Sequence, residues 1–168
     1  MVSLWMLMIL PISELPFFSV QKQNPLTRLP IRILTAAEEY CPSQALTTLA
    51  TSHGLTSYRY IFSAQFPNTA LFPDAGAYHS SELREIFGTY PVDGATPEQI
   101  KLAEVMQKVW ADFVKDPYSG PGWPAVTTGP DPVLQNFMSD GSAASQPFSA
   151  TDGVCPLVIP LDGALGTI

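Results

Sequence analysis

One short stretch of strand-forming residues does most to limit the folds open to this chain. Ser57 to Phe62 reads Ser-Tyr-Arg-Tyr-Ile-Phe, which is rich in residues that favour strands, and Phe66-Pro67-Asn68 breaks it. A strand needs neighbours for its backbone N–H and C=O groups, so this segment must belong to a sheet. Helical patterns lie on both sides of it along the chain. The sequence therefore predicts an α/β fold, with helices covering a sheet.

The first of these helices precedes the strand. It is predicted to begin at Cys41-Pro42, because proline suits a first helical turn, and to end before Gly54. Its apolar residues share one face and are Ala45, Leu46, Leu49 and Ala50. His53 falls in the last turn, where we expect it to complement the negative end of the helix dipole rather than to take part in chemistry.

The second helix follows the strand and carries the clearest start signal in the chain. Thr96 can cap it, Pro97 occupies its first position, and Gln99 can complete a capping box. A stripe of apolar side chains then recurs at helical spacing: Leu102, Met106, Val109, Trp110 and Phe113. We interpret this stripe as core packing rather than as a cofactor site. Asp116-Pro117 ends the helix.

A single histidine lies between the strand and the second helix. His79 follows the small-residue loop 73–76 and precedes a short amphipathic helix, whose predicted apolar face is formed by Leu83, Ile86 and Phe87. At such a junction the backbone can hold the residue while its ring faces a cleft, as proton transfer requires. A lone histidine is more often a surface or capping residue, so the pattern alone leaves both roles open.

The residues around His79 narrow this choice. The segment Ala77 to Gly88 resembles the histidine motif of the type-B carboxylesterase and cholinesterase family, a branch of the α/β-hydrolases, in which His-x-x-Glu-Ile/Leu is followed by Phe-Gly. Other stretches resemble fungal members of that family: Tyr58-Arg59-Tyr60, Phe66-Pro67-Asn68 and Trp123-Pro124. The resemblance implies the C-terminal part of an α/β-hydrolase fold, with His79 as general base of a Ser-Glu-His triad. It also implies a supporting role for Glu82, which the residues alone would leave in solvent.

The two cysteines do not have the spacing of a metal site. Cys41 and Cys155 are far apart, and neither has another histidine or cysteine at a zinc-finger interval. We expect no metal and no cofactor. From the residues alone both could be free thiols. The family resemblance implies that they form a disulfide, which in turn implies an oxidising, secretory compartment.

Part of the catalytic apparatus implied by the resemblance is missing from these 168 residues. A serine esterase of this kind needs a Gly-x-Ser-x-Gly nucleophile elbow, and none occurs; Gly141 to Ser145 lacks the spacing. There is no Gly-Gly oxyanion segment, and the triad acid of the family lies upstream of everything matched. We therefore expect the C-terminal fragment of a serine carboxylic ester hydrolase, inactive alone, whose substrate is a small carboxylic ester.

Other interpretations remain open. The chain could be a non-catalytic hydrolase-like binding or adhesion module, or a degenerate remnant. A separate chain carrying the serine half could also complement it. The oligomeric state cannot be read from the sequence.

Charge argues against one class of partner. The chain has 8 basic and 15 acidic residues and a net charge of −7, so we expect no binding to nucleic acid. The apolar start, Met1 to Leu10, stops at Pro11 and is shorter than the roughly 20 residues of a membrane span. As a signal peptide it lacks a basic start and a small-x-small cleavage site. A weak signal peptide and a mis-assigned start remain alternatives.

Three segments are predicted along the chain. Residues 1–34 form an irregular N-terminal segment, residues 35–157 form the C-terminal portion of a carboxylesterase type-B domain, and residues 158–168 form a tail. Within the middle segment, Val133 to Phe137 is expected to be a short extended piece. Ser139 to Ser149 is rich in Gly, Ser and Ala and is expected to be a loop.

Overall fold

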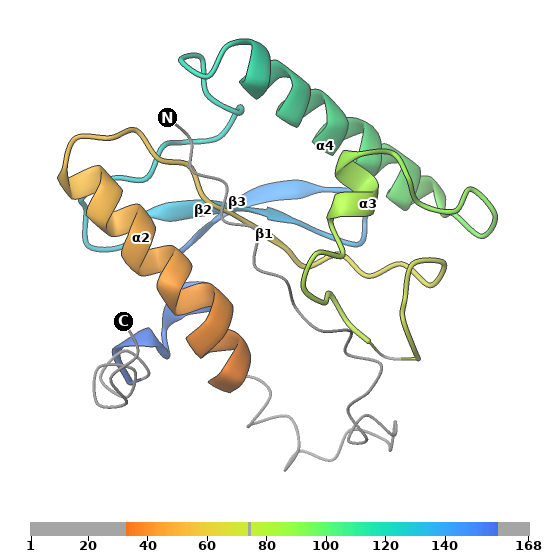
Figure 1. The fold of residues 1–168 in the computed structure, drawn as a ribbon, viewed down its shortest axis with the longest axis horizontal. Helices are drawn as coiled ribbons and strands as arrows, with labels where there is room; N and C mark the ends of the chain where they lie inside the picture. Colours follow the sequence, from red (N-terminus) through yellow and green to blue (C-terminus); the bar gives the residue numbers. More distant parts are fainter. Residues whose placement is uncertain (1–32, 74, 158–168) are drawn as a thin grey trace.

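The computed structural model describes residues 33–73 and 75–157, which form a three-stranded sheet with helices on both faces (Figure 1). The predictions for Met1 to Leu10, for most of the N-terminal segment and for the tail lie outside these residues. The strands are β1 (Tyr60–Phe62), β2 (Val133–Phe137) and β3 (Ala143–Pro147). β2 is central and runs parallel to β1 and antiparallel to β3. The predicted α/β class is confirmed.

The third strand contradicts the sequence-based prediction, which assigned Ser139 to Ser149 to a loop. A tight turn reverses the chain after β2: the Gly141 N–H donates to Met138 O (3.1 Å), and the Met138 N–H donates to Ser142 O (2.9 Å). β3 then pairs with β2 along its whole length. Its residues, Ala-Ala-Ser-Gln-Pro, have little intrinsic strand preference and stay mostly exposed at the sheet edge. Pairing with an adjacent strand therefore overrides composition here.

The helix before β1 begins earlier than predicted. A π-helical turn, η2 (Ala36–Tyr40), leads directly into α2 (Cys41–Ser52). In a regular α-helix Pro42 would lack an N–H donor and would crowd the carbonyl four residues earlier. The wider turn relieves this, since the Cys41 N–H reaches back five residues to Ala36 O.

The end of α2 agrees with the prediction. Gly54 adopts a left-handed φ of 76° and donates to Thr51 O, while the Leu55 N–H donates to Ala50 O, which together form a Schellman motif. His53 Nδ1 lies 2.9 Å from Leu49 O, so the ring satisfies a carbonyl of the last turn. His53 thus has the helix-terminal role expected of it.

The predicted stripe of α4 (Pro97–Lys115) packs against one face of the sheet. Leu102 and Met106 are fully buried, and the Trp110 ring meets the Tyr60 ring edge-on, with centroids 5.0 Å apart. Phe137 of β2 completes this core. The opposite face of the sheet carries a smaller cluster of Ile61, Val126, Leu134 and Phe148. Alternate side chains of each strand thus serve the two faces.

Two local predictions, for the start of α4 and for the short helix packed on it, are confirmed only in part. Thr96 caps α4 by accepting from the Gln99 N–H (3.2 Å), but the Gln99 side chain turns to Glu85 instead of closing the capping box. In the short helix α3 (Leu83–Ile86), Ile86 is buried as expected. Leu83 and Phe87 are exposed, because a single helical turn packed on α4 presents Glu85 and Ile86 to it.

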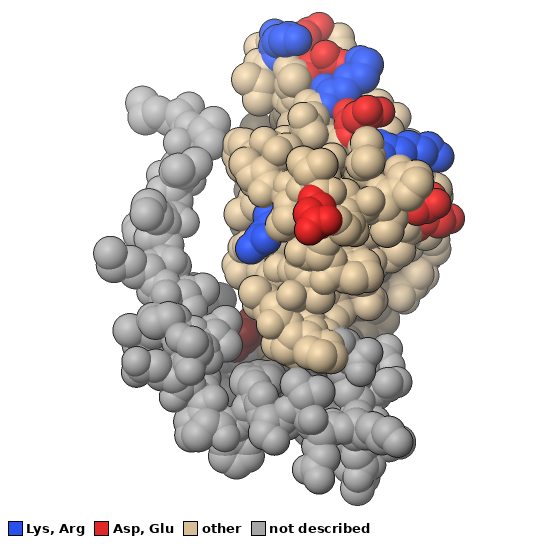
Figure 2. Space-filling model, turned by 90° about the vertical axis from the view of Figure 1, so that its right-hand side faces the viewer, with Lys and Arg blue, Asp and Glu red and all other residues tan. Residues whose placement is uncertain are grey.

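Charged side chains are unevenly spread. Figure 2 shows one face on which side chains of both signs gather toward the top, the level at which α4 lies in Figure 1, while most of the remainder is uncharged. Lys108 and Asp112 form an ion pair one turn apart on α4. Apolar side chains are also exposed on α2, where Leu46 and Leu49 are 69% and 56% accessible.

A buried anchor joins α2, β1 and residues 149–155. The Arg59 guanidinium bonds both carboxylate oxygens of Asp152 in α5 (Ser149–Asp152) and donates to Tyr40 O (2.9 Å). Beside it, Cys41 and Cys155 form the disulfide that the resemblance implies, with both side chains buried. The start of α2, the residue before β1 and the segment 149–155 are therefore held together by a covalent bond and a buried ion pair.

We predict that this disulfide is a main source of stability. Because it closes a loop across 114 residues, its loss should lower the free energy of unfolding by about 3–5 kcal/mol in the chain-entropy account. Urea unfolding of a Cys41→Ser/Cys155→Ser variant tests this. Reduced wild-type chain is the matched control, since it keeps both sulfur atoms. Equal midpoints for oxidised and reduced chain would contradict the prediction.

Candidate active site

His79 lies in the loop between β1 and α3, with its side chain 62% exposed. The contact that the structure gives its ring comes from η2: Nδ1 lies 3.1 Å from Oε1 of Glu39, whose side chain is 46% exposed. A carboxylate at Nδ1 is the arrangement in which the other ring nitrogen, Nε2, can act as a base. The loop therefore presents an imidazole with one nitrogen engaged.

The backbone around His79 is tightly turned. The Tyr78 hydroxyl donates to Thr69 O (2.8 Å), and the Ser81 N–H donates to Tyr78 O (3.0 Å). Between them Ser80 adopts a left-handed φ of 67°, which non-glycine residues rarely take and which tends to mark functional loops. Hydrogen bonds on both sides of His79 hold the turn in this conformation.

Glu82 is half-buried and interacts with the sheet rather than lying free in solvent. Its carboxylate lies near enough to the Tyr60 hydroxyl, at the start of β1, to influence its ionisation. Burial of the phenol, together with the negative charge of Glu82, raises the pKa of Tyr60 to about 12. This interaction connects the His79 segment with β1. The supporting role of Glu82 beside the His79 imidazole stays a prediction.

Glu85 is a buried acid that the sequence analysis missed. The residue is 1% exposed. Its Oε1 accepts from Gln99 Nε2 (2.9 Å), while Oε2 and Gln99 Oε1 are buried with no hydrogen-bond partner. Burial raises the pKa of Glu85, and the Gln99 hydrogen bond only partly offsets this. The sequence signal was the position of Glu85 beside Ile86, on the side of α3 that packs on α4.

The site lacks a nucleophile within the described chain. Among residues 33–73 and 75–157, no serine hydroxyl is bonded to the His79 imidazole. In the same residues no cluster of three or more His, Cys, Asp or Glu side chains could hold a metal ion. The described helices also include none that is long and apolar enough to cross a membrane. The geometry offers a base with a carboxylate partner, not a complete catalytic centre.

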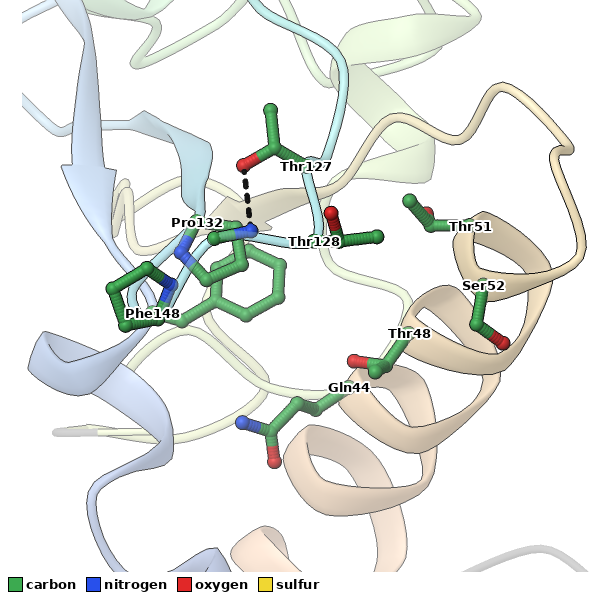
Figure 3. Close-up of a pocket in the computed structure, with 10 residues that line it drawn as sticks. Gln44, Thr48, Thr51, Ser52, Thr127, Thr128, Pro132 and Phe148 are labelled. Carbon is green, nitrogen blue, oxygen red and sulfur yellow. Dashed lines mark hydrogen bonds between the residues drawn. The ribbon is translucent and has the colours of Figure 1, made fainter.

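A pocket of about 350 Å³ lies elsewhere, between α2 and the segment leading to β2 (Figure 3). Hydroxyl groups dominate its polar lining, and neither His79 nor Glu39 takes part in it. The lining residues are Gln44, Thr48, Thr51, Ser52, Thr127, Thr128, Gly129, Pro130, Pro132 and Phe148. An uncharged pocket of this kind suits a neutral ligand.

Comparison with known proteins identifies the family. Residues 20–147 match the carboxylesterase family, which is well over half of the chain. The chain belongs to the carboxylesterase family. In fold it is similar to the carboxylesterase EST55 of Geobacillus stearothermophilus, at a TM-score of 0.58 and 21% identity over 80% of this chain. The sheet and helices described above are thus part of an α/β-hydrolase fold.

The curated relatives of this carboxylesterase-family chain are fungal and much longer. It is 31% identical over 133 residues to Secreted lipase 5 of Gibberella zeae, covering 74% of this chain and 25% of the lipase. It is 35% identical over 100 residues to Chlorogenic acid esterase of Aspergillus niger, covering 48% of this chain and 20% of the esterase. The chain spans about a quarter or less of each relative.

We predict that Glu85 makes stability depend on pH. Because its pKa is raised above the ordinary value of 4.5, its stabilising contribution is full below that pH and is lost as pH rises through the folded-state pKa. In Glu85→Gln, the new side-chain amide can both accept from Gln99 Nε2 and donate to Gln99 Oε1. The variant should match wild type near pH 4.5 and exceed it by about 1–3 kcal/mol at pH 8.

Unfolding free energies from urea titrations across this range provide the measurement. Glu104→Gln, on the exposed face of α4, is the matched control for removing one acidic charge. A difference between Glu85→Gln and wild type that does not change with pH would be incompatible with a buried, proton-binding Glu85.

Proposed function

We propose that this chain is the histidine-bearing, C-terminal portion of a secreted carboxylic ester hydrolase, with residues 35–157 as its folded part. His79 is the general base: its Nε2 takes the proton of a serine supplied by sequence outside these 168 residues and later returns it to the leaving alcohol. The substrate is a small carboxylic ester. Alone, the chain does not turn over ester.

The family match together with the setting of His79 carries this proposal. The His79 imidazole lies on a strained loop, where its Nδ1 contacts the Glu39 carboxylate and the ring is accessible to solvent. That is the setting a general base needs. The relative named Secreted lipase 5 and the disulfide favour an extracellular protein. The missing Gly-x-Ser-x-Gly elbow favours an inactive isolated chain.

Fluorophosphonate labelling of secretions tests whether the chain belongs to an intact serine esterase. These reagents mark only activated serines, and an antibody against residues 120–126 would identify the protein. We expect a labelled band much heavier than the 18.2 kDa of this chain and no labelling of the purified 168-residue chain. An unlabelled band of 18.2 kDa in secretions would contradict the proposal.

The role of His79 is tested by substitution in the labelled protein. His79→Gln removes the proton acceptor and should lower kcat for ester hydrolysis by about 10²- to 10⁴-fold. His53→Gln, at the exposed end of α2, makes the same chemical change away from the loop and should leave kcat within twofold. Equal activities of the two variants would rule out His79 as the base.

A second candidate is a non-catalytic binding module. The observation that favours it is the hydroxyl-lined pocket, which is independent of His79 and bears no charged lining residue. Under this alternative the chain would bind a neutral ligand between α2 and residues 127–132, and His79→Gln would leave that binding unchanged.

A further inference from the structure

The pocket between α2 and residues 127–132 lies at the edge of the sheet opposite to the His79 loop. β1 and β2 are parallel. Residues 127–132 enter β2 at its amino end, whereas the His79 loop follows the carboxyl end of β1. In open α/β sheets the main ligand site lies outside the carboxyl ends of the strands. The pocket is therefore separate from the loop that carries the candidate base.

α2 turns polar side chains, rather than apolar ones, toward this pocket. Gln44, Thr48 and Thr51 lie on the side of the helix that faces residues 127–132 (Figure 3). Leu46 and Leu49 are exposed instead. A surface helix normally packs its apolar stripe against the protein. The reversed arrangement leaves a space lined by hydroxyl and amide groups where an apolar contact would be expected.

Both walls of the pocket are held in place. The Val126 N–H donates to Ser57 O (2.8 Å) at one end of the segment 127–132. The Phe148 N–H donates to Pro132 O (2.8 Å) at its other end. On the opposite wall, α2 is fixed by the disulfide and by the buried ion pair described above. A site that is already formed loses less conformational entropy when it binds a ligand.

Among the described residues, no charged side chain lines the pocket, although Asp131 lies between two lining prolines. Its carboxylate accepts from the Ser149 N–H (3.0 Å) and from the Ser149 hydroxyl (2.7 Å), at the start of α5. The Arg59 guanidinium lies 4.6 Å from the centroid of the Phe148 ring, but it is paired with Asp152. A charged ligand would therefore find no counter-ion in the lining.

Three lining side chains are available to a ligand. In the part of the chain that the structure describes, Gln44, Thr48 and Thr128 make no hydrogen bond to the protein. A hydroxyl or a carboxamide can both donate and accept. The Phe148 ring and the two prolines add apolar surface beside them. The pocket thus offers neutral two-way hydrogen bonding next to an aromatic ring.

We propose that this pocket binds a neutral saccharide. The hydroxyl groups of one sugar ring exchange hydrogen bonds with Gln44, Thr48 and Thr128, and the C–H face of the ring packs on Phe148. The pocket volume of about 350 Å³ is near the lower end of the range for small-molecule sites, roughly 300–1,000 Å³. A wholly apolar ligand fits less well, because it would leave the three polar groups without partners.

The proposal names a ligand class for the binding module considered above as a second candidate. It does not depend on His79, because the pocket and the histidine loop share no residue.

Titration of the ¹⁵N-labelled, oxidised chain with methyl glycosides, followed by ¹H–¹⁵N NMR, tests the inference. The ligands are the methyl glycosides of glucose, galactose, mannose and xylose, each added separately. At least one should cause saturable shifts of the amide signals of Thr48, Thr51, Thr128 and Gly129, and none should shift that of His79. Cyclohexanol has a six-membered ring but a single hydroxyl, and should bind about tenfold more weakly or worse.

Substitutions in the lining test the assigned contacts. Thr48→Val and Gln44→Leu remove polar groups while keeping most of the side-chain volume. Each should raise the Kd of the tightest-binding glycoside by about three- to tenfold. Thr47→Val is the matched control, because Thr47 lies on the same helix but outside the lining, and it should leave the Kd unchanged. Unaltered amide spectra would show that each variant keeps the fold.

The inference is overturned if no glycoside causes saturable shifts, if cyclohexanol binds as tightly, or if Thr47→Val weakens binding as much as Thr48→Val. The proposed esterase function fails separately, through ester turnover that survives His79→Gln. A protein that loses turnover in His79→Gln and binds no glycoside would keep the esterase function and lose only this site.

Discussion

The ion pair between Arg59 and Asp152 is the interaction on which the rest of the arrangement depends. Burying two charges costs free energy unless their hydrogen-bonding groups are satisfied, and here nearly all are. Arg59 also reaches Tyr40 O and Ser43 Oγ, and its guanidinium stacks 4.6 Å from the Phe148 ring. A residue just before β1 thus holds η2 and α2 to α5. The disulfide beside it makes the same connection covalent.

Much of the fold could be predicted because its signals are local. The cap of α4, its apolar stripe and the glycine that ends α2 each follow from residues close in sequence. The predictions were wrong or incomplete where the structure of a segment depends on residues distant in sequence. β3 exists because β2 lies beside it, and Glu85 is buried because Gln99 faces it from α4. The residues of β3 give no sign of its pairing, and the position of Glu85 beside Ile86 is only a weak sign of its burial.

The candidate site likewise has one residue that could be predicted from local sequence and one that could not. His79 was predicted from a motif contained within twelve residues, Ala77 to Gly88. Glu39 could not be singled out, because it is one of two adjacent acids on a helix and nothing nearby in sequence relates it to a histidine 40 positions later. Only the turn of η2 and the anchors that follow it bring the two together. Pro42, which predicted a helix start, is the residue that the wider turn accommodates.

The span of the disulfide has a consequence for how the protein would respond to proteases. All the described strands, the His79 loop and α4 lie between Cys41 and Cys155. A single cut in any exposed loop of that region would therefore leave both pieces covalently joined as one molecule. In an extracellular setting, where proteases and oxidising conditions coexist, a nicked chain would still migrate as one molecule. It would separate into fragments only on reduction.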